Sequence, residues 1–225
     1  MGLLLGAAVA AALALNVLPA AAATDPYVPG TTGYDVSYPN CGAATPAGAF
    51  AVVGVNHGRP FTVNTCLGAE YGSAPTSPLP SLYMNAAYSG AYRRNITSAC
   101  SAASGGNLAW AIGCSEAEYS LQQAGGRGAA MWWLDVETAN SWSSGNLSLN
   151  QSAIQGAVDR LNQTGLPVGV YSTASMWKTI TGGSFTPTGL AADWVAAGSC
   201  STPFTSSPVW LTQSTSGGVD YDTAC

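Results

Sequence analysis

Short apolar runs alternate with segments of helical period along most of the chain. The apolar runs predict eight strands, at residues 33–37, 49–55, 82–86, 131–137, 167–171, 192–196, 209–213 and 219–221. Helical patterns are predicted at 66–71, 115–125, 148–165 and 174–180, and they become scarce after Ile180. Strands that alternate with helices predict parallel pairing. We therefore predict an α/β fold with a closed barrel of parallel strands and poorly developed late helices. A doubly wound sheet is the alternative, but no glycine-rich phosphate motif follows any strand.

The two helix starts are placed from capping signals, and one segment before them has no clear pattern. Ser115 with Glu118, and Ser148 with Gln151, have the spacing of a capping box. Residues 88–113 are rich in Ser, Gly and Asn, which predicts a long loop.

The central strand, residues 131–137, ends in two carboxylates. Side chains alternate across a strand, so Asp135 and Glu137 are expected on one face, with Cα atoms about 6.5–7 Å apart. The simpler interpretation of such a pair is a strand end that runs into a solvated loop. The aromatic context, with Trp132 and Trp133 directly before the acids, favours a functional site.

The charge of the chain narrows the classes of ligand. Only 8% of the 225 residues are charged, the formal net charge is −5, and Lys and Arg together number six. Nucleic acid and anionic membrane surfaces both require clustered cations, so neither is expected as a partner. The 47% of hydrophobic residues suffices for a folded core.

The N-terminus has the composition of a targeting segment. An apolar stretch precedes Ala21, Ala22 and Ala23, as before a signal-peptidase site. We expect a signal peptide at 1–23, a Pro/Gly/Thr linker at 24–32 and one barrel domain at 33–225, in a secreted protein with possible retention at the cell wall. A membrane anchor is the alternative, although the leucine-rich part is short for a bilayer span.

An even number of cysteines in an exported chain predicts disulfides. Their short separations in sequence favour three local pairs, Cys41–Cys66, Cys100–Cys114 and Cys200–Cys225. A zinc site is the alternative, but the chain has no C-x-x-C motif and His57 is its single histidine. Neither a metal nor a cofactor is expected.

Four acids are predicted to converge at one end of the barrel. Functional side chains lie at the carboxyl ends of barrel strands, and Asp35, Asp135, Glu137 and Asp220 all fall at or near strand ends. Clustered carboxylates raise one another's pKa values, so a protonated acid and a charged partner can coexist. Aromatic rings together with carboxylates are typical of sites that cleave glycosidic bonds.

Several segments together resemble the family 25 glycoside hydrolases, which are lysozyme-like N-acetylmuramidases. The segments are GYDVS at 33–37, WWLDVE at 132–137, GVYS at 169–172 with Trp177, WVA at 194–196, WLTQ at 210–213 and VDY at 219–221. This resemblance runs from Gly33 to Asp222. It implies a TIM-like (β/α)5(β)3 barrel and cleavage of the β-1,4 bond after N-acetylmuramic acid in peptidoglycan.

The resemblance also implies roles for residues. Glu137 matches the general acid, and Asp135, Asp35 and Asp220 match supporting carboxylates. We expect burial and Asp135 to raise the pKa of Glu137, while Asp135 stays charged and stabilises the transition state. Whether the anomeric configuration is retained or inverted stays open, although the resemblance favours retention. The expected substrate contacts are Asn85, Trp142, Tyr171, Trp177 and Gln213.

Two positions depart from the family pattern and keep other functions open. The family often has a basic residue after the second strand and a Tyr-His pair at the end of the third, where this chain has Asn56 and Met84-Asn85. These departures indicate a divergent, cysteine-containing branch. The main alternative is a non-catalytic barrel that binds carbohydrate or cell wall, and a further one is a structural, disulfide-stapled envelope protein. For the glycoside hydrolase we expect a monomer whose partner is peptidoglycan or a related polysaccharide.

Overall fold

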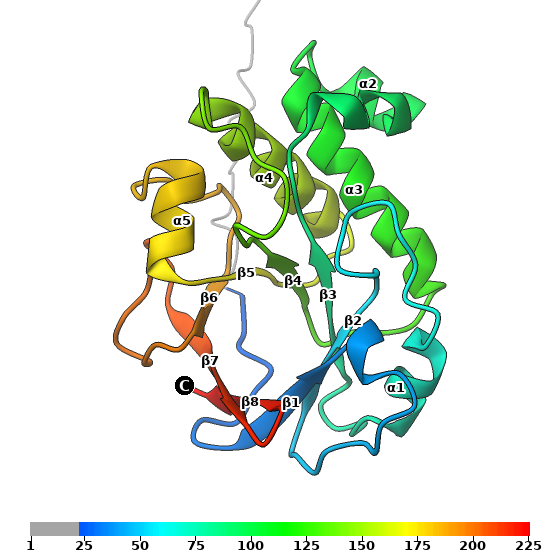
Figure 1. Cartoon of the computed structure of the whole chain (residues 1–225), viewed down its shortest axis with the longest axis vertical. Coiled ribbons are helices and arrows are strands. Elements are labelled where there is room, and N and C mark those ends of the chain that lie inside the picture. Colours follow the sequence, from blue (N-terminus) through cyan, green and yellow to red (C-terminus); the bar gives the residue numbers. More distant parts are fainter. Residues whose placement is uncertain (1–22) are drawn as a thin grey trace, which may run out of the picture.

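Eight strands form a closed barrel in the computed structural model, which describes residues 23–225 (Figure 1). The strands are β1 (Thr32–Val36), β2 (Ala51–Gly54), β3 (Ser81–Asn85), β4 (Trp132–Asp135), β5 (Val168–Ser172), β6 (Ala192–Ala196), β7 (Val209–Ser216) and β8 (Val219–Ala224). Each strand pairs with the next along the chain, and β8 closes the ring on β1. The barrel prediction is therefore confirmed. The predicted signal segment lies outside the described residues, apart from Ala23.

The helices cover only the first part of the barrel. They are α1 (Leu67–Ser73), α2 (Ser98–Ala103), α3 (Leu108–Ala124), α4 (Leu147–Asn162) and α5 (Ala174–Thr181), with short 3-10 turns η1 (Tyr38–Asn40) and η2 (Gly90–Asn95). In Figure 1, α3 and α4 lie side by side on the flank of β3 and β4, and no helix follows α5. The predicted loss of late helices is confirmed. Within residues 23–225, no helix combines the length and the apolar character that a bilayer crossing demands.

The last strand runs against its neighbours, which corrects the prediction of an all-parallel barrel. Strands β1 to β7 are parallel, but β8 is antiparallel to both β7 and β1. A two-residue hairpin at Gly217 and Gly218, with φ of 61° and 79°, reverses the chain between β7 and β8. Such a turn requires positive φ, which glycine adopts without a steric penalty. Strand β8 therefore begins at the end of the barrel where the other strands finish.

The segment before β4 is more helical than predicted. Residues 88–113 contain η2, α2 and the start of α3, not a long loop. Asn107 caps α3 by accepting a hydrogen bond from the Trp110 amide at 3.1 Å. Ser115 lies inside this helix, and its hydroxyl donates to the Ala111 carbonyl at 2.7 Å. Ser115 and Glu118 have the spacing of a capping box by coincidence. The predicted helix start at Ser115 is therefore wrong, and α3 begins at Leu108.

The start of α4 was also misplaced. Asn146 is the N-cap, because its side-chain oxygen accepts from the Ser148 amide at 3.2 Å, so Ser148 is already helical. The helix ends at Asn162, and Gly165 follows in a turn with φ of 78°. A short polar side chain such as Asn is among the preferred N-caps, and the chain here offered two candidates two residues apart.

Strand β4 divides its side chains between two cores. Trp132, Leu134 and Val136 face the helices and join the larger apolar cluster. Trp133 faces the barrel interior, where its ring lies 5.7 Å from that of Trp194. Gly169 on β5 makes room for Trp133, since a methyl group on that glycine would overlap the indole. The alternation predicted for this strand is confirmed.

The segment before β1 closes the bottom of the barrel, which corrects the prediction of a linker at 24–32. Tyr27 is only 4% exposed and belongs to the interior cluster. Its hydroxyl lies 2.6 Å from the Ser81 hydroxyl and accepts from the Trp133 indole at 3.0 Å. The Pro and Gly residues around Tyr27 suggested a linker, but they carry one aromatic anchor into the core.

All six cysteines are paired as their spacing predicted. The disulfides are Cys41–Cys66, Cys100–Cys114 and Cys200–Cys225, with Cα–Cα distances of 5.6, 5.7 and 5.5 Å. The third disulfide ties the C-terminus to the loop between β6 and β7. The second disulfide joins α2 to α3, and the first joins the end of η1 to the start of α1.

We predict that Tyr27 contributes to stability as a core residue does. Tyr27→Ala should lower the free energy of unfolding by about 3–5 kcal/mol, because removal of a buried aromatic ring leaves a cavity. Val28→Ala is the matched control, since Val28 is 64% exposed and should change stability by less than about 0.5 kcal/mol. Urea denaturation of the three proteins measures both values. Equal stability of the two variants would restore the linker interpretation.

Candidate active site

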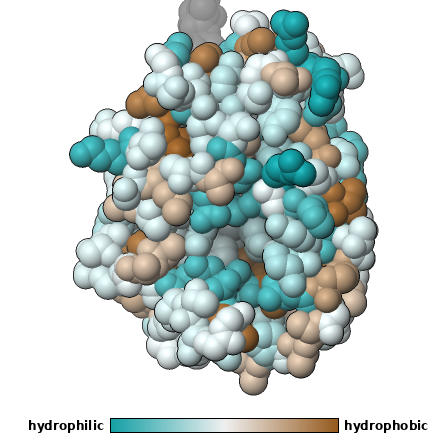
Figure 2. Space-filling view, in the orientation of Figure 1, coloured by the Kyte–Doolittle hydropathy of each residue, from teal (hydrophilic) through white to brown (hydrophobic). Residues whose placement is uncertain are grey.

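An acidic cleft lies at the end of the barrel where the parallel strands finish. It has a volume of about 330 Å³. The lining residues are Asp35, Tyr83, Asp135, Glu137, Tyr171, Trp194, Gln213, Thr215 and Asp220. In the space-filling view, a hollow bordered by hydrophilic residues lies over the ring of strands (Figure 2). The four predicted carboxylates thus lie together, although they come from β1, the end of β4 and β8.

Barrel closure brings Asp35 and Asp220 together. These two residues are register partners in the antiparallel β1–β8 ladder. The Thr215 hydroxyl donates to Asp220 at 2.5 Å across the β7–β8 hairpin. Asp220 therefore reaches the cleft because β8 starts there, not because β8 ends there.

Gln213 organises the side of the cleft next to β1. Its side-chain amide donates to Asp35 Oδ2 at 2.7 Å, and its oxygen accepts from the Tyr171 hydroxyl at 2.7 Å. Burial raises the pKa of Asp35 to about 7, the Gln213 hydrogen bond opposes the rise, and the charges of Asp220 and Glu137 add to it. Tyr171 and Gln213, both predicted to contact substrate, are thus placed in the cleft.

Asp135 lies deeper than Glu137 and has the less stable charge. It is 7% exposed, Asn85 donates to its Oδ2, and its Oδ1 has no hydrogen-bond partner among the described residues. Burial, followed by the charges of Glu137 and Asp35, raises its pKa well above the ordinary value. The charge that we expect on Asp135 is therefore disfavoured by its surroundings in the free protein, and its role stays a prediction. The reason for the raised pKa is that Asp135 is the last residue of β4, where the barrel interior still excludes water.

Glu137 lies two residues beyond Asp135, at the rim, and is half-buried. Burial raises its pKa, and the charge of Asp220 adds to the rise. The sequence predicts Asp135 as the charged neighbour that raises this pKa, whereas in the structure that neighbour is Asp220. Asp135 and Glu137 share the face of the strand that the alternation predicted.

Three of the five predicted substrate contacts, Asn85, Trp142 and Trp177, lie outside the cleft lining. Asn85 is 7% exposed and donates to Asp135 instead. Trp177 is 1% exposed and packs between Phe185 and Phe204, so it is a core residue, and the prediction of a sugar contact is wrong. Trp142 is partly buried beside a separate hollow, and its indole donates to the Glu137 carbonyl at 2.8 Å. It therefore holds the backbone of Glu137 in place.

Sequence reasoning missed several residues that build the cleft. Tyr83 and Trp194 form part of its lining, and Tyr171 packs against Trp194 with ring centroids 4.6 Å apart. Asp222 is fully buried beneath, where it accepts from the Trp194 indole at 2.8 Å. The two-residue period of the strands relates Tyr83 to Asn85 and Asp222 to Asp220, and that signal could have found them.

The cleft suits an uncharged polyhydroxylated ligand. No Lys, Arg or His is among its lining residues. Within residues 23–225, no group of three or more His, Cys, Asp or Glu side chains could hold a metal ion. What remains are carboxyl, amide and hydroxyl groups around aromatic rings, which can bind sugar hydroxyls and transfer protons.

A closed barrel with three helix-free final strands and this cleft defines a lysozyme-type glycoside hydrolase fold. The comparison with solved structures agrees, since the chain has the barrel fold of the GH25 lysozymes. A family GH25 lysozyme from Aspergillus fumigatus superposes with a TM-score of 0.62 and 20% identity, over 87% of this chain and 93% of that one.

Other similar structures belong to the same group. The bacterial lysozyme from Streptomyces coelicolor has a TM-score of 0.61 and 21% identity, with 87% of this chain and 92% of that one covered. The muramidase from Trichobolus zukalii has a TM-score of 0.60 and 18% identity, with 86% and 93% covered. Residues 112–216 match the model of a family described as lysozyme-like protein 1, and no curated protein sequence matches the chain. The predicted resemblance is confirmed.

We predict that two neighbours shift the pKa of Asp35 in opposite directions. Gln213→Leu should raise it above about 7, because the carboxylate loses a hydrogen bond, and Asp220→Asn should lower it, because a nearby negative charge disappears. A ¹³C NMR titration of the Asp35 carboxyl measures both shifts. Shifts of the same sign in both variants would contradict the assignment.

The raised pKa also means that the contribution of Asp35 to stability is lost as the pH rises from 3.8 through about 7.

Proposed function

We propose that this protein is a glycoside hydrolase that cleaves the β-1,4 bonds of peptidoglycan as a muramidase does, with Glu137 as the general acid. The observation that carries the proposal is the convergence of four carboxylates in one cation-free cleft on a GH25-type barrel. Binding of a neutral glycan needs no cluster of acids, because hydroxyl and amide groups suffice. Protonation of a leaving oxygen does need one acid whose pKa is raised.

Glu137 suits the acid role because of its position and its pKa. It lies at the rim, where a glycosidic oxygen can reach it, and burial with the Asp220 charge raises its pKa. A proton is therefore retained closer to neutral pH than on an ordinary glutamate. The Trp142 indole fixes the backbone at this position, which reduces the freedom of the side chain to leave the productive geometry.

Asp135 suits a supporting role below the sugar. Asn85 fixes one of its oxygens, while Oδ1 has no partner among the described residues and is free to accept a hydrogen bond. In a substrate-assisted mechanism this oxygen would accept the N–H of the sugar's acetamido group and so orient its carbonyl oxygen toward the anomeric carbon. Asp35 and Asp220 on the facing strands would stabilise the positive charge that develops on the sugar ring.

We predict that Glu137→Gln lowers the rate of peptidoglycan cleavage by about 10²-fold or more and leaves the fold intact, because general acid catalysis contributes about 10²–10⁴. Release of reducing sugar from purified peptidoglycan measures the rate. Glu118→Gln is the matched control, since Glu118 lies on α3 in an ion pair with Arg160 and should have little effect.

Three outcomes have different meanings. A wild-type rate in Glu137→Gln would remove Glu137 from the mechanism. A wild-type protein that binds peptidoglycan without releasing sugar would be a wall-binding barrel instead of an enzyme. Loss of activity in Glu118→Gln as well would show that the assay reports on folding.

We also propose that the protein is exported. The three disulfides support this, since such bonds persist in oxidising compartments. Cleavage after Ala23 would leave Tyr27, which the barrel interior requires.

We predict that protein recovered outside an expressing cell begins at Thr24 when its N-terminus is sequenced. A start beyond Tyr27 would contradict the proposal.

A further inference from the structure

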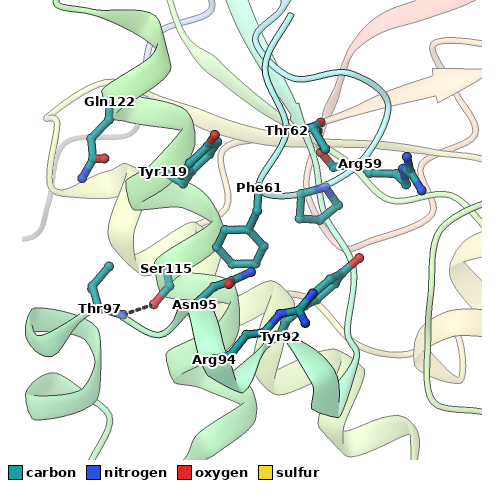
Figure 3. Close-up of a pocket in the computed structure, with 11 residues that line it drawn as sticks. Arg59, Phe61, Thr62, Tyr92, Arg94, Asn95, Thr97, Ser115, Tyr119 and Gln122 are labelled. Carbon is teal, nitrogen blue, oxygen red and sulfur yellow. Dashed lines mark hydrogen bonds between the residues drawn. The ribbon is translucent and has the colours of Figure 1, made fainter.

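A second cavity lies outside the acidic cleft, between the loop after β2, the turn η2 and helix α3. Its volume is about 500 Å³, and residues from all three elements line it (Figure 3). We call it the arginine pocket, because Arg59 and Arg94 are on its wall. The lining has no acidic side chain. Neither the proposed reaction nor the core uses this cavity.

The two arginines of the pocket have no carboxylate partners. Within residues 23–225 the single ion pair joins Arg160 to Glu118, so Arg59 and Arg94 are unpaired and exposed. Glu116, whose charge acts on Tyr92 of the pocket, is 1% exposed, and burial raises its pKa well above the ordinary value. Glu116 does not line the pocket and accepts from the Ala87 amide, not from a guanidinium group. In a chain of net charge −5, the pocket is therefore locally positive.

The floor of the pocket is aromatic. Phe61 lies at its centre in Figure 3, with ring centroids 5.4 Å from Tyr92 and 5.8 Å from Tyr119. Phe61 has a φ of 58°, a conformation that is unfavourable for an aromatic residue. The Thr62 hydroxyl holds this turn, because it accepts from the His57 amide at 2.8 Å and donates to the Arg59 carbonyl at 2.6 Å. The ring is thus held in the pocket before any ligand arrives.

Two segments that line the pocket leave the barrel at the end where the acidic cleft lies. The loop that carries Phe61 and the turn that carries Tyr92 leave the barrel at the carboxyl ends of β2 and β3. Asn56 links these two exits by accepting from the Asn85 amide at 3.0 Å, and Asn85 in turn donates to Asp135 in the cleft. Asn56 and Asn85 therefore connect the base of the two pocket-forming segments with the acidic cleft.

We propose that the arginine pocket binds the acidic peptide stem that projects from the glycan. This inference rests on the proposed function, since it takes peptidoglycan as the polymer in the cleft. Guanidinium groups bind carboxylates in bidentate geometry. A polyol phosphate of the cell wall is also anionic and could bind the arginines. The aromatic floor, however, suits the methyl and methylene groups of a short peptide better than a hydrated polyol phosphate.

The test measures binding without turnover. The parent protein carries Glu137→Gln, and the probe is the soluble stem peptide that an amidase releases from peptidoglycan. Titration calorimetry should show binding to this parent and binding about tenfold weaker or more after Arg59→Gln with Arg94→Gln. Arg93→Gln is the matched control, because Arg93 is an exposed neighbour that does not line the pocket, and the affinity should not change. Phe61→Ala should also weaken binding although it keeps the charge.

The outcomes separate this inference from the proposed function. Absence of peptide binding, or equal affinity in the double arginine variant, would overturn the inference, and so would tighter binding of poly(glycerol phosphate) than of the peptide. A wild-type protein that binds the peptide but releases no sugar would retain the inference and refute the hydrolase. Salt should weaken the peptide interaction in the parent, because exposed charges carry it.

Discussion

The antiparallel pairing of β8 with β1 is the constraint on which the site depends. It closes the barrel and puts Asp220 opposite Asp35, two acids separated by most of the chain. It also continues below them, where Asp222 pairs with Gly33. The Cys200–Cys225 disulfide holds the end of β8. If β8 were absent, β1 and β7 would both be free edges, and one wall of the acidic cleft would be missing.

Closure also forces carboxyl groups into a small space, and the structure shows how the fold tolerates this. Hydrogen-bond donors reach some of the oxygens, from Gln213 to Asp35 and from Trp194 to Asp222. Others stay without partners among the described residues, notably Asp135 Oδ1 and Asp222 Oδ2. Burial of polar oxygens without partners is unfavourable for folding. The unpaired oxygens at the cleft therefore lower the stability of the fold. Burial of the apolar side chains between the barrel and the helices offsets this loss.

Features that follow from the local sequence pattern could be predicted. Features that depend on how deeply a side chain is buried in the fold could not. Strand alternation placed Asp135 and Glu137 on one face, and cysteine spacing gave the disulfides. However, no pattern distinguishes the partly buried ring of Tyr171, which lines the cleft, from the fully buried ring of Trp177, because both are aromatic residues in apolar segments. The rise in the pKa of Asp135 likewise depends on how far the barrel interior excludes water. The antiparallel direction of β8 could have been predicted, because the Gly217-Gly218 pair is a hairpin signal in the sequence.

Under our two proposals, the distribution of charge lets two separate sites bind different parts of one polymer. A cleft lined by carboxylates favours a neutral sugar and an oxocarbenium-like transition state, but it repels an acidic peptide attached to that sugar. Exposed charges are screened within about 8–10 Å at physiological salt, so relief from this repulsion requires a cation close to the peptide itself. The loops after β2 and β3 supply Arg59 and Arg94 beside the cleft, yet outside its lining. Separation of the two sites lets the carboxylates keep their raised pKa values, because a guanidinium inside the cleft would lower them.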